Sequence, residues 1–117
     1  MPYMVIITTP DTLKKKPEML RASIRALTRA MKFAREHPDE AKRFVRPAFA
    51  ETDEAIFNEA WDNYQQTIPK TPVISRAQFE KTEAWLNITA AKPLTVRFED
   101  SIISKIAEEA AADILGK

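Results

Sequence analysis

The residues best suited to chemistry surround the single histidine of the 117-residue sequence. His37 stands in "REHPDEAKRF" beside Glu36, Asp39 and Glu40, a set that suggests a hard-metal site or an acid/base pair. Transition-metal sites normally need more than one nitrogen or sulfur ligand, and the chain has no cysteine. Pro38, directly after His37, favours a corner between two helices instead. We therefore expect no metal and no cofactor.

The hydroxyl side chains do not form a catalytic set. Thr52, Ser75 and Ser101 each precede a helical pattern and are expected to cap a helix N-terminus. With one histidine, no Ser-His-acid triad can be assembled, and a single glycine excludes a glycine-rich phosphate loop. The chain is not predicted to be an enzyme, no catalytic residue is assigned, and ligand-binding residues stay unknown.

Basic residues recur along one predicted helix. They form a stripe with a threonine among them, namely Arg21, Arg25, Thr28, Lys32 and Arg35, and Lys14 to Lys16 lie just ahead. Such a stripe can hold phosphates or an anionic membrane surface. No nucleic-acid motif accompanies it, so a solvated helix face is the favoured interpretation and no nucleic-acid partner is expected.

Charge is divided unequally along the chain. The net charge is +1, but residues 1–46 hold 11 basic and 5 acidic residues, whereas residues 47–117 hold 7 and 12. The overall composition, 30% charged and 44% hydrophobic, is typical of a soluble globular protein. No basic segment with a long apolar core begins the chain, so no secretion signal is expected in it.

Three aromatic residues, Trp61, Tyr64 and Trp85, have the shape to stack on a flat ligand. Their helical spacing puts them with neighbouring apolar positions, and aromatic residues dominate ordinary cores. Both tryptophans are therefore predicted to lie in the core.

Five to six helices are expected to position these residues. Helix starts are predicted at Pro10, Pro17, Pro38, Thr52, Ser75 and Ser101. The helix from Pro17 is the most regular, because its apolar residues recur at steps of three and four: Leu20, Ile24, Leu27, Met31 and Ala34. Similar stripes follow in the later helices: Ile56, Phe57, Ala60, Trp61 and Tyr64, then Phe79, Thr82, Trp85 and Leu86, and finally Ile103, Ile106, Ala110 and Ile114.

Two segments depart from this helical pattern. Tyr3 to Thr9 is rich in β-branched residues and apolar almost throughout, which predicts a strand covered on both faces. Leu94 to Phe98 alternates apolar and polar residues, which predicts a second short strand or an extended crossing segment. The fold class is thus mainly α with one N-terminal strand.

The order of these segments resembles the C-terminal part of the substrate-binding proteins of bacterial ABC importers, in the group that binds nitrate, sulfonates, taurine and thiamine pyrimidine precursors (NMT1/THI5-like). The resemblance rests on "VIITTPDTLKKKPEMLRASIRALTRAMKFAREHPDEAKRFV", "ISRAQFEKTEAWL" and "VRFEDSI". It implies the C-terminal portion of an α/β periplasmic-binding-protein type II fold, in which Tyr3 to Thr9 is a strand returning between strands from earlier sequence. No binding motif carries over residue by residue.

By this resemblance, residues 1–117 form a single domain that is part of a two-lobe solute-binding protein, which works in the periplasm with an ABC permease. With no export signal expected, a cytoplasmic location stays open. The alternative function is a freestanding helical interaction module. In either case we expect a homo-oligomer through Tyr3 to Thr9, since an unpaired strand invites pairing with a second copy.

Overall fold

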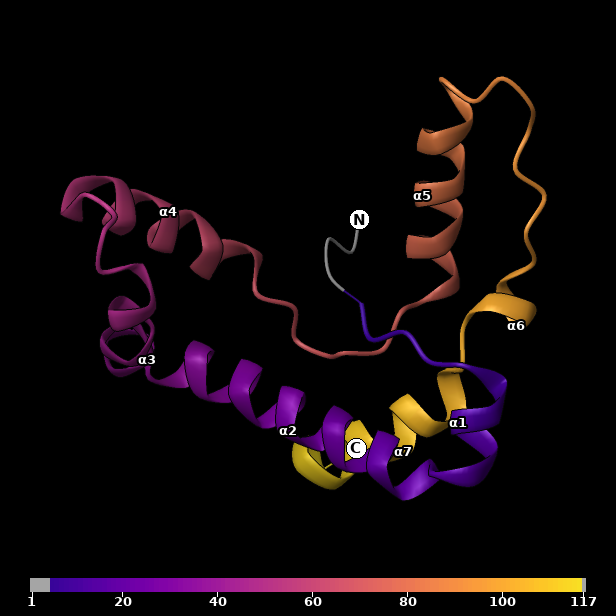
Figure 1. Ribbon diagram of the computed structural model, residues 1–117, viewed down its shortest axis with the longest axis horizontal. Coiled ribbons are helices and arrows are strands. Elements are labelled where there is room, and N and C mark those ends of the chain that lie inside the picture. Colours follow the sequence, from indigo (N-terminus) through magenta and orange to yellow (C-terminus); the bar gives the residue numbers. More distant parts are fainter. Residues whose placement is uncertain (1–4, 117) are drawn as a thin grey trace.

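The computed structural model describes residues 5–116, which form seven α-helices and one 3₁₀ helix. In chain order these are α1 (Pro10–Lys15), α2 (Pro17–Glu36), α3 (Pro38–Val45), η1 (Arg46–Phe49), α4 (Glu54–Thr67), α5 (Arg76–Asn87), α6 (Phe98–Ser101) and α7 (Ser104–Leu115). Figure 1 shows α7 lying along the long helix α2, and α5 standing apart from that pair. The prediction of a mainly helical fold is confirmed, with more helices than expected.

Proline fixes the first three helix starts. Pro10, Pro17 and Pro38 each occupy the first turn of their helix, where the missing N–H has no intrahelical partner to lose. The Thr9 hydroxyl accepts a hydrogen bond of 3.1 Å from the Thr12 N–H, as a helix cap should. The predicted corner at His37 is confirmed, because α2 ends at Glu36 and α3 begins one residue later.

The later helix caps agree with the sequence only in part. Ser75 forms the predicted capping box with Gln78. The Gln78 backbone N–H donates to the Ser75 hydroxyl at 3.2 Å, and the Ser75 backbone N–H donates to the Gln78 side-chain oxygen at 2.8 Å. Thr52 was expected to cap α4, but Asp53 does so, since its carboxylate is the stronger acceptor at a helix N-terminus. Ser101 was expected to cap the last helix, but it ends α6 and donates to the Arg97 carbonyl.

The predicted N-terminal strand is wrong over the described part of its range. Residues 5–9 lie outside any helix and pair with no other segment among residues 5–116, whereas Tyr3 and Met4 fall outside the described residues. A strand needs a neighbour for its backbone N–H and C=O groups, and the described chain offers none here. For Leu94 to Phe98, the strand alternative is wrong: residues 94–97 lie outside any helix or strand, and Phe98 begins α6.

Most of the buried residues among residues 5–116 form two small clusters rather than one core. In the first, Leu20 and Ile24 of α2 pack against Ile106 and Ala110 of α7, with Leu13 of α1 at the margin. The second joins the end of α2 to α3 and α4, and it contains Ala41, Phe57 and Trp61, bordered by Phe33, Ala34 and Val45. Each cluster includes or borders residues near one end of α2, so this helix connects the two clusters.

The arrangement is open for its length. Its radius of gyration is 16.8 Å, whereas a compact domain of this length has about 13 Å. Its accessible surface is 9042 Å², against roughly 6,500 Å² for a folded monomer of this mass. Large apolar side chains predicted to be inside, among them Ile56, Tyr64 and Trp85, lie exposed. The described chain therefore leaves much of its apolar surface uncovered.

Candidate functional site

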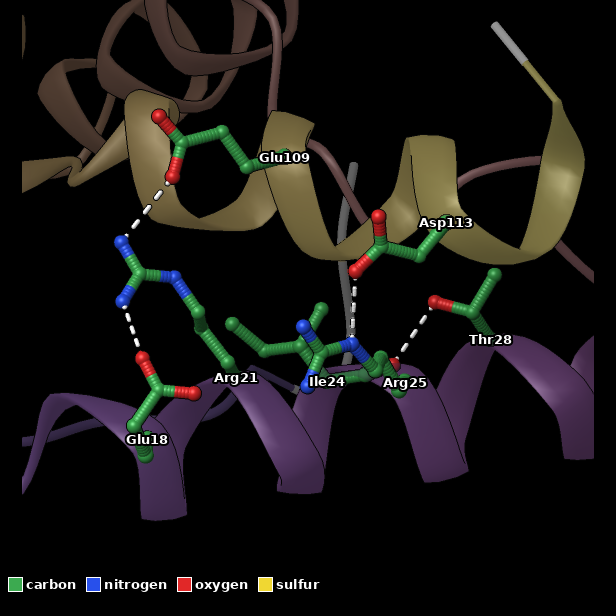
Figure 2. Close-up of polar contacts among 7 residues, drawn as sticks. All are labelled: Glu18, Arg21, Ile24, Arg25, Thr28, Glu109 and Asp113. Carbon is green, nitrogen blue, oxygen red and sulfur yellow. Dashed lines mark hydrogen bonds and ion pairs between the residues drawn. The ribbon is translucent and has the colours of Figure 1, made fainter.

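Two residues of the predicted basic stripe on α2, Arg21 and Arg25, contact acidic residues of α7 (Figure 2). Arg21 donates one hydrogen bond of 2.6 Å to Glu18, one turn earlier in α2, and one of 3.0 Å to Glu109 of α7. Arg25 donates from Nε to Asp113 of α7 at 2.7 Å. These contacts join two helices that are 88 residues apart in the sequence.

Both arginines are held where solvent still reaches them. The side chains of Arg21 and Arg25 are 28% and 32% exposed, and their carboxylate partners on α7 about half. Hydrogen bonds to Glu109 and then to Glu18 raise the pKa of Arg21 above its usual value, because both carboxylates favour the charged guanidinium. The seam between α2 and α7 is thus an apolar contact bordered by paired charges.

The other stripe residues have different surroundings. Thr28 is buried, at 2% exposure, and its hydroxyl donates a hydrogen bond of 2.7 Å to the Ile24 carbonyl one turn earlier in α2. Thr28 is therefore not part of an exposed basic surface. Arg35 donates 2.6 Å to the Pro69 carbonyl and thereby ties the loop after α4 to α2. Lys32 lines a shallow hollow of about 370 Å³ with Arg29, Glu36 and His37.

The favoured interpretation of a solvated stripe is therefore only partly right, because much of the positive charge is used within the molecule. The pairing was missed although the sequence carries a signal for it. Arg21 and Arg25 are four residues apart, as are Glu109 and Asp113, so each pair projects from one face of its helix at the same spacing.

Within residues 5–116 no helix has the length and apolar character to cross a bilayer.

His37 occupies the corner between α2 and α3. Its backbone N–H donates 2.8 Å to the Phe33 carbonyl, and its ring lies 5.1 Å from the Phe33 ring. Asp39 and Glu40 share a second hollow of about 260 Å³ with it. Among residues 5–116, no group of three or more histidine, cysteine or acidic side chains is placed to hold a metal ion. The geometry at His37 is that of a helix corner whose imidazole lies tilted against the Phe33 ring.

The three aromatic candidates do not meet in one place. Trp61 is buried beside Phe57, as predicted, and Tyr64 packs on its ring at 6.0 Å while remaining partly exposed. Trp85 is 58% exposed on α5, so its predicted place in the core is wrong. The physical reason is that nothing in the described chain packs over that side of α5.

Comparison with known proteins gives one partial match. Residues 1–41 match the family model described as NMT1/THI5 like. Comparisons with the curated proteins and with the solved structures give no match. The matched range ends in the first turn of α3 and includes α1 and α2, the helix on which both clusters depend. The first 41 residues of the chain are thus similar to the NMT1/THI5-like family, which points to a binding-protein family.

Proposed function

We propose that this chain is the helical C-terminal part of the solute-binding component of an ABC importer. The solute is a small nutrient such as nitrate, a sulfonate or taurine, or a thiamine pyrimidine precursor, and the component works in the periplasm beside its permease. The observation that carries the proposal is the similarity of residues 1–41 to the NMT1/THI5-like family. The assignment to the C-terminal part rests on the order of segments in the sequence.

The open arrangement supports a role as part of a larger assembly. Residues 5–7 are apolar and lie exposed, with Ile7 at 86%. Burying large aliphatic side chains is worth roughly 1.5 to 3 kcal/mol each, so a surface of this kind is stabilised by being covered. In the proposed component, the packed pair of α2 and α7 is the stable unit of the C-terminal part. Neighbouring segments of the receptor cover the apolar side chains that are exposed in this chain.

Solute binding and partner association together test this proposal. The purified chain is heated with nitrate, taurine or an aminopyrimidine, with chloride at the same ionic strength as control. A solute that binds the folded chain stabilises it by about 2.7 kcal/mol when the solute concentration is a hundred times its Kd. One solute class should therefore raise the Tm. In parallel, the chain tagged in its native cells should co-purify with a permease and its ATPase. If no solute raises the Tm and neither protein co-purifies, the proposal fails.

A second candidate function is a freestanding helical interaction module that oligomerises through its N-terminal segment. The observation that favours it is the exposure of Val5, Ile6 and Ile7 ahead of α1. Under this alternative, Ile7→Ser lowers the oligomeric state in sedimentation velocity and no nutrient changes the Tm. Under the receptor role, the solute-dependent rise in Tm is present and decides between the two.

A further inference from the structure

The C-terminal half of α2 and the last turn of α7 form the hollow of about 370 Å³. Most of its lining comes from α2 and the C-cap of this helix: Arg29, Lys32, Phe33, Glu36 and His37. These residues follow at steps of three, one, three and one, which places them on one face of the helix. Asp113 and Ile114 of α7 complete the lining. The hollow therefore belongs to the helix pair that also forms the first buried cluster.

Two cations of the hollow are not used within the described chain. Elsewhere on α2, Arg21 and Arg25 donate to carboxylates of α7, and Arg35 donates to a backbone carbonyl. Arg29 and Lys32 form no ion pair with another residue in the range 5–116. Both side chains are thus available to a ligand in the hollow.

The carboxylates of the hollow differ in the same way. Asp113 is held by Arg25 at 2.7 Å. Glu36 has no cationic partner in the part of the chain that the structure describes, although Lys32 lies one turn before it. At 1.5 Å per residue, Glu36 lies about 6 Å further along the axis of α2 than Lys32. The hollow consequently offers free positive charge and, one turn further along α2, free negative charge.

We propose that this hollow binds a short ω-amino acid, which has a carboxylate at one end, an ammonium group at the other and an aliphatic chain between them. Arg29 and Lys32 bind the carboxylate, because a guanidinium group can donate two parallel hydrogen bonds and an ammonium group adds a compact charge. Glu36 accepts hydrogen bonds from the ammonium group of the ligand. The aliphatic chain lies on Phe33 and Ile114, which are half-buried, so that its methylene groups leave water.

Size and charge narrow the class of ligand. A volume of about 370 Å³ is at the lower end of the range of about 300 to 1,000 Å³ for small-molecule pockets. The free carboxylate of Glu36 would repel a second acidic group, which disfavours a phosphate chain or a nucleic-acid backbone. Arg29, Glu36 and His37 are exposed, so water weakens the charged contacts, and we expect a Kd of about 1 mM.

His37 supplies a reporter for binding, because it is the only histidine of the chain and lines the hollow. Its ring C–H signals are followed by NMR at fixed pH while 4-aminobutyrate is added to the full chain. Butyrate and butylamine have the same carbon chain but lack one charged end each, so they are the matched control ligands. The Kd of 4-aminobutyrate should be at least fivefold lower than that of either control. The indole signals of Trp61 and Trp85, which do not line the hollow, should stay in place.

Two variants test the two ends of the site separately. Lys32→Met removes the ammonium group but keeps an unbranched side chain, and it should weaken the binding of 4-aminobutyrate at least fivefold. Glu36→Gln should reduce the affinity for 4-aminobutyrate to that for butyrate, without weakening butyrate. The controls Lys14→Met and Glu59→Gln change the net charge equally at exposed positions outside the hollow, and they should leave each Kd unchanged. If Lys32→Met loses its helical circular dichroism, Arg29→Gln takes its place.

Three outcomes overturn the proposal. His37 signals that do not move at about 10 mM 4-aminobutyrate, ten times the expected Kd, mean that the hollow does not bind this class of molecule. Equal affinities for the three ligands mean that the two charged ends are not recognised together. Equal loss of affinity in Lys14→Met and Lys32→Met means that the net charge of the chain attracts the ligand.

This inference does not rest on the transport role. A nutrient that raises the Tm of the wild type and of Glu36→Gln equally binds outside the hollow, and the transport role then stands whether or not 4-aminobutyrate moves the His37 signals. Binding of 4-aminobutyrate without a rise in Tm from any nutrient supports the hollow and counts against the transport role.

Discussion

Arg25 of α2 and Asp113 of α7 lie 2.7 Å apart, donor to acceptor, and so tie the first long helix to the last. Arg21 and Glu109 repeat the contact one helical turn away, at 3.0 Å (Figure 2). Between them, Ile24 faces Ile106 and Ala110 in the first buried cluster. The charged contacts set which turn of α2 meets which turn of α7, and the apolar contact supplies most of the stabilisation.

A double-mutant cycle on Arg25→Ala and Asp113→Ala should give a small favourable coupling. The pair is partly solvated, at 32% and 51% exposure, so about 0.2 to 1 kcal/mol is expected in urea unfolding. The coupling should shrink in 1 M salt. The cycle on Lys15 and Asp11, each 68% exposed, is the control and should give less. A coupling that is independent of salt would contradict the view that the seam is solvated.

Freeing the arginines should create the anion-binding surface that the sequence alone suggested. Glu109→Gln with Asp113→Asn removes the α7 carboxylates that hold Arg21 and Arg25. The variant should elute from heparin at a higher salt concentration than the wild type, because released guanidinium groups can pair with sulfates. The control Asp62→Asn with Glu108→Gln changes the net charge equally, at one carboxylate of α4 and one of α7 that do not pair with Arg21 or Arg25. Equal elution of the two variants would mean that net charge alone governs retention.

Enlarging the smallest residue of the seam should separate α2 from α7. Ala110 has no exposed surface, so Ala110→Leu forces side chains apart and should lower the free energy of unfolding by about 1 to 3 kcal/mol. Ala26→Leu, on an exposed side of α2, should change it by less than about 0.5 kcal/mol. Thermal or urea unfolding measures both. Equal stability of the two variants would show that this cluster is not packed as described.

The carboxyl group of Glu99 should titrate below the usual range for glutamate. A hydrogen bond from Arg76 is the largest cause that lowers its pKa. Since the folded pKa is the lower one, the stabilisation is present above the unfolded pKa and is lost as pH falls through the folded pKa. NMR titration should show that Arg76→Gln raises the Glu99 pKa markedly, whereas Arg97→Gln, which removes a weaker charge effect, raises it less.

Local chemistry made much of the helix pattern predictable. The prolines at positions 10, 17 and 38 and the capping box of Ser75 with Gln78 mark helix starts by interactions within a few residues, and the structure contains them. The cap of α4 was misassigned because Thr52 and Asp53 are adjacent acceptors, and the preference for the stronger acceptor, Asp53, was not applied.

Contacts between distant segments were harder to predict. Periodicity marks Trp85 and Tyr64 as core candidates, but burial also requires an opposing surface, and in the described chain both side chains stay about half exposed. The strand at Tyr3 to Thr9 failed for a related reason over residues 5–9, since the apolar pattern was read correctly but no pairing neighbour is present. The sequence shows that Arg21 and Arg25 have the same four-residue spacing as Glu109 and Asp113. Predicting their ion pairs also required knowing that α2 packs against α7.

The contact of α2 with α7 has a topological consequence. Because the two helices that close the first cluster lie at opposite ends of the described chain, the segments between them form one large loop whose ends are clamped together (Figure 1). A single cut in the irregular stretch around Pro69 to Pro72 would therefore leave two fragments that still hold one another through the clamp. The chain is therefore suited to fragment complementation, in which the contact between α2 and α7 replaces the cleaved peptide bond in holding the two fragments together.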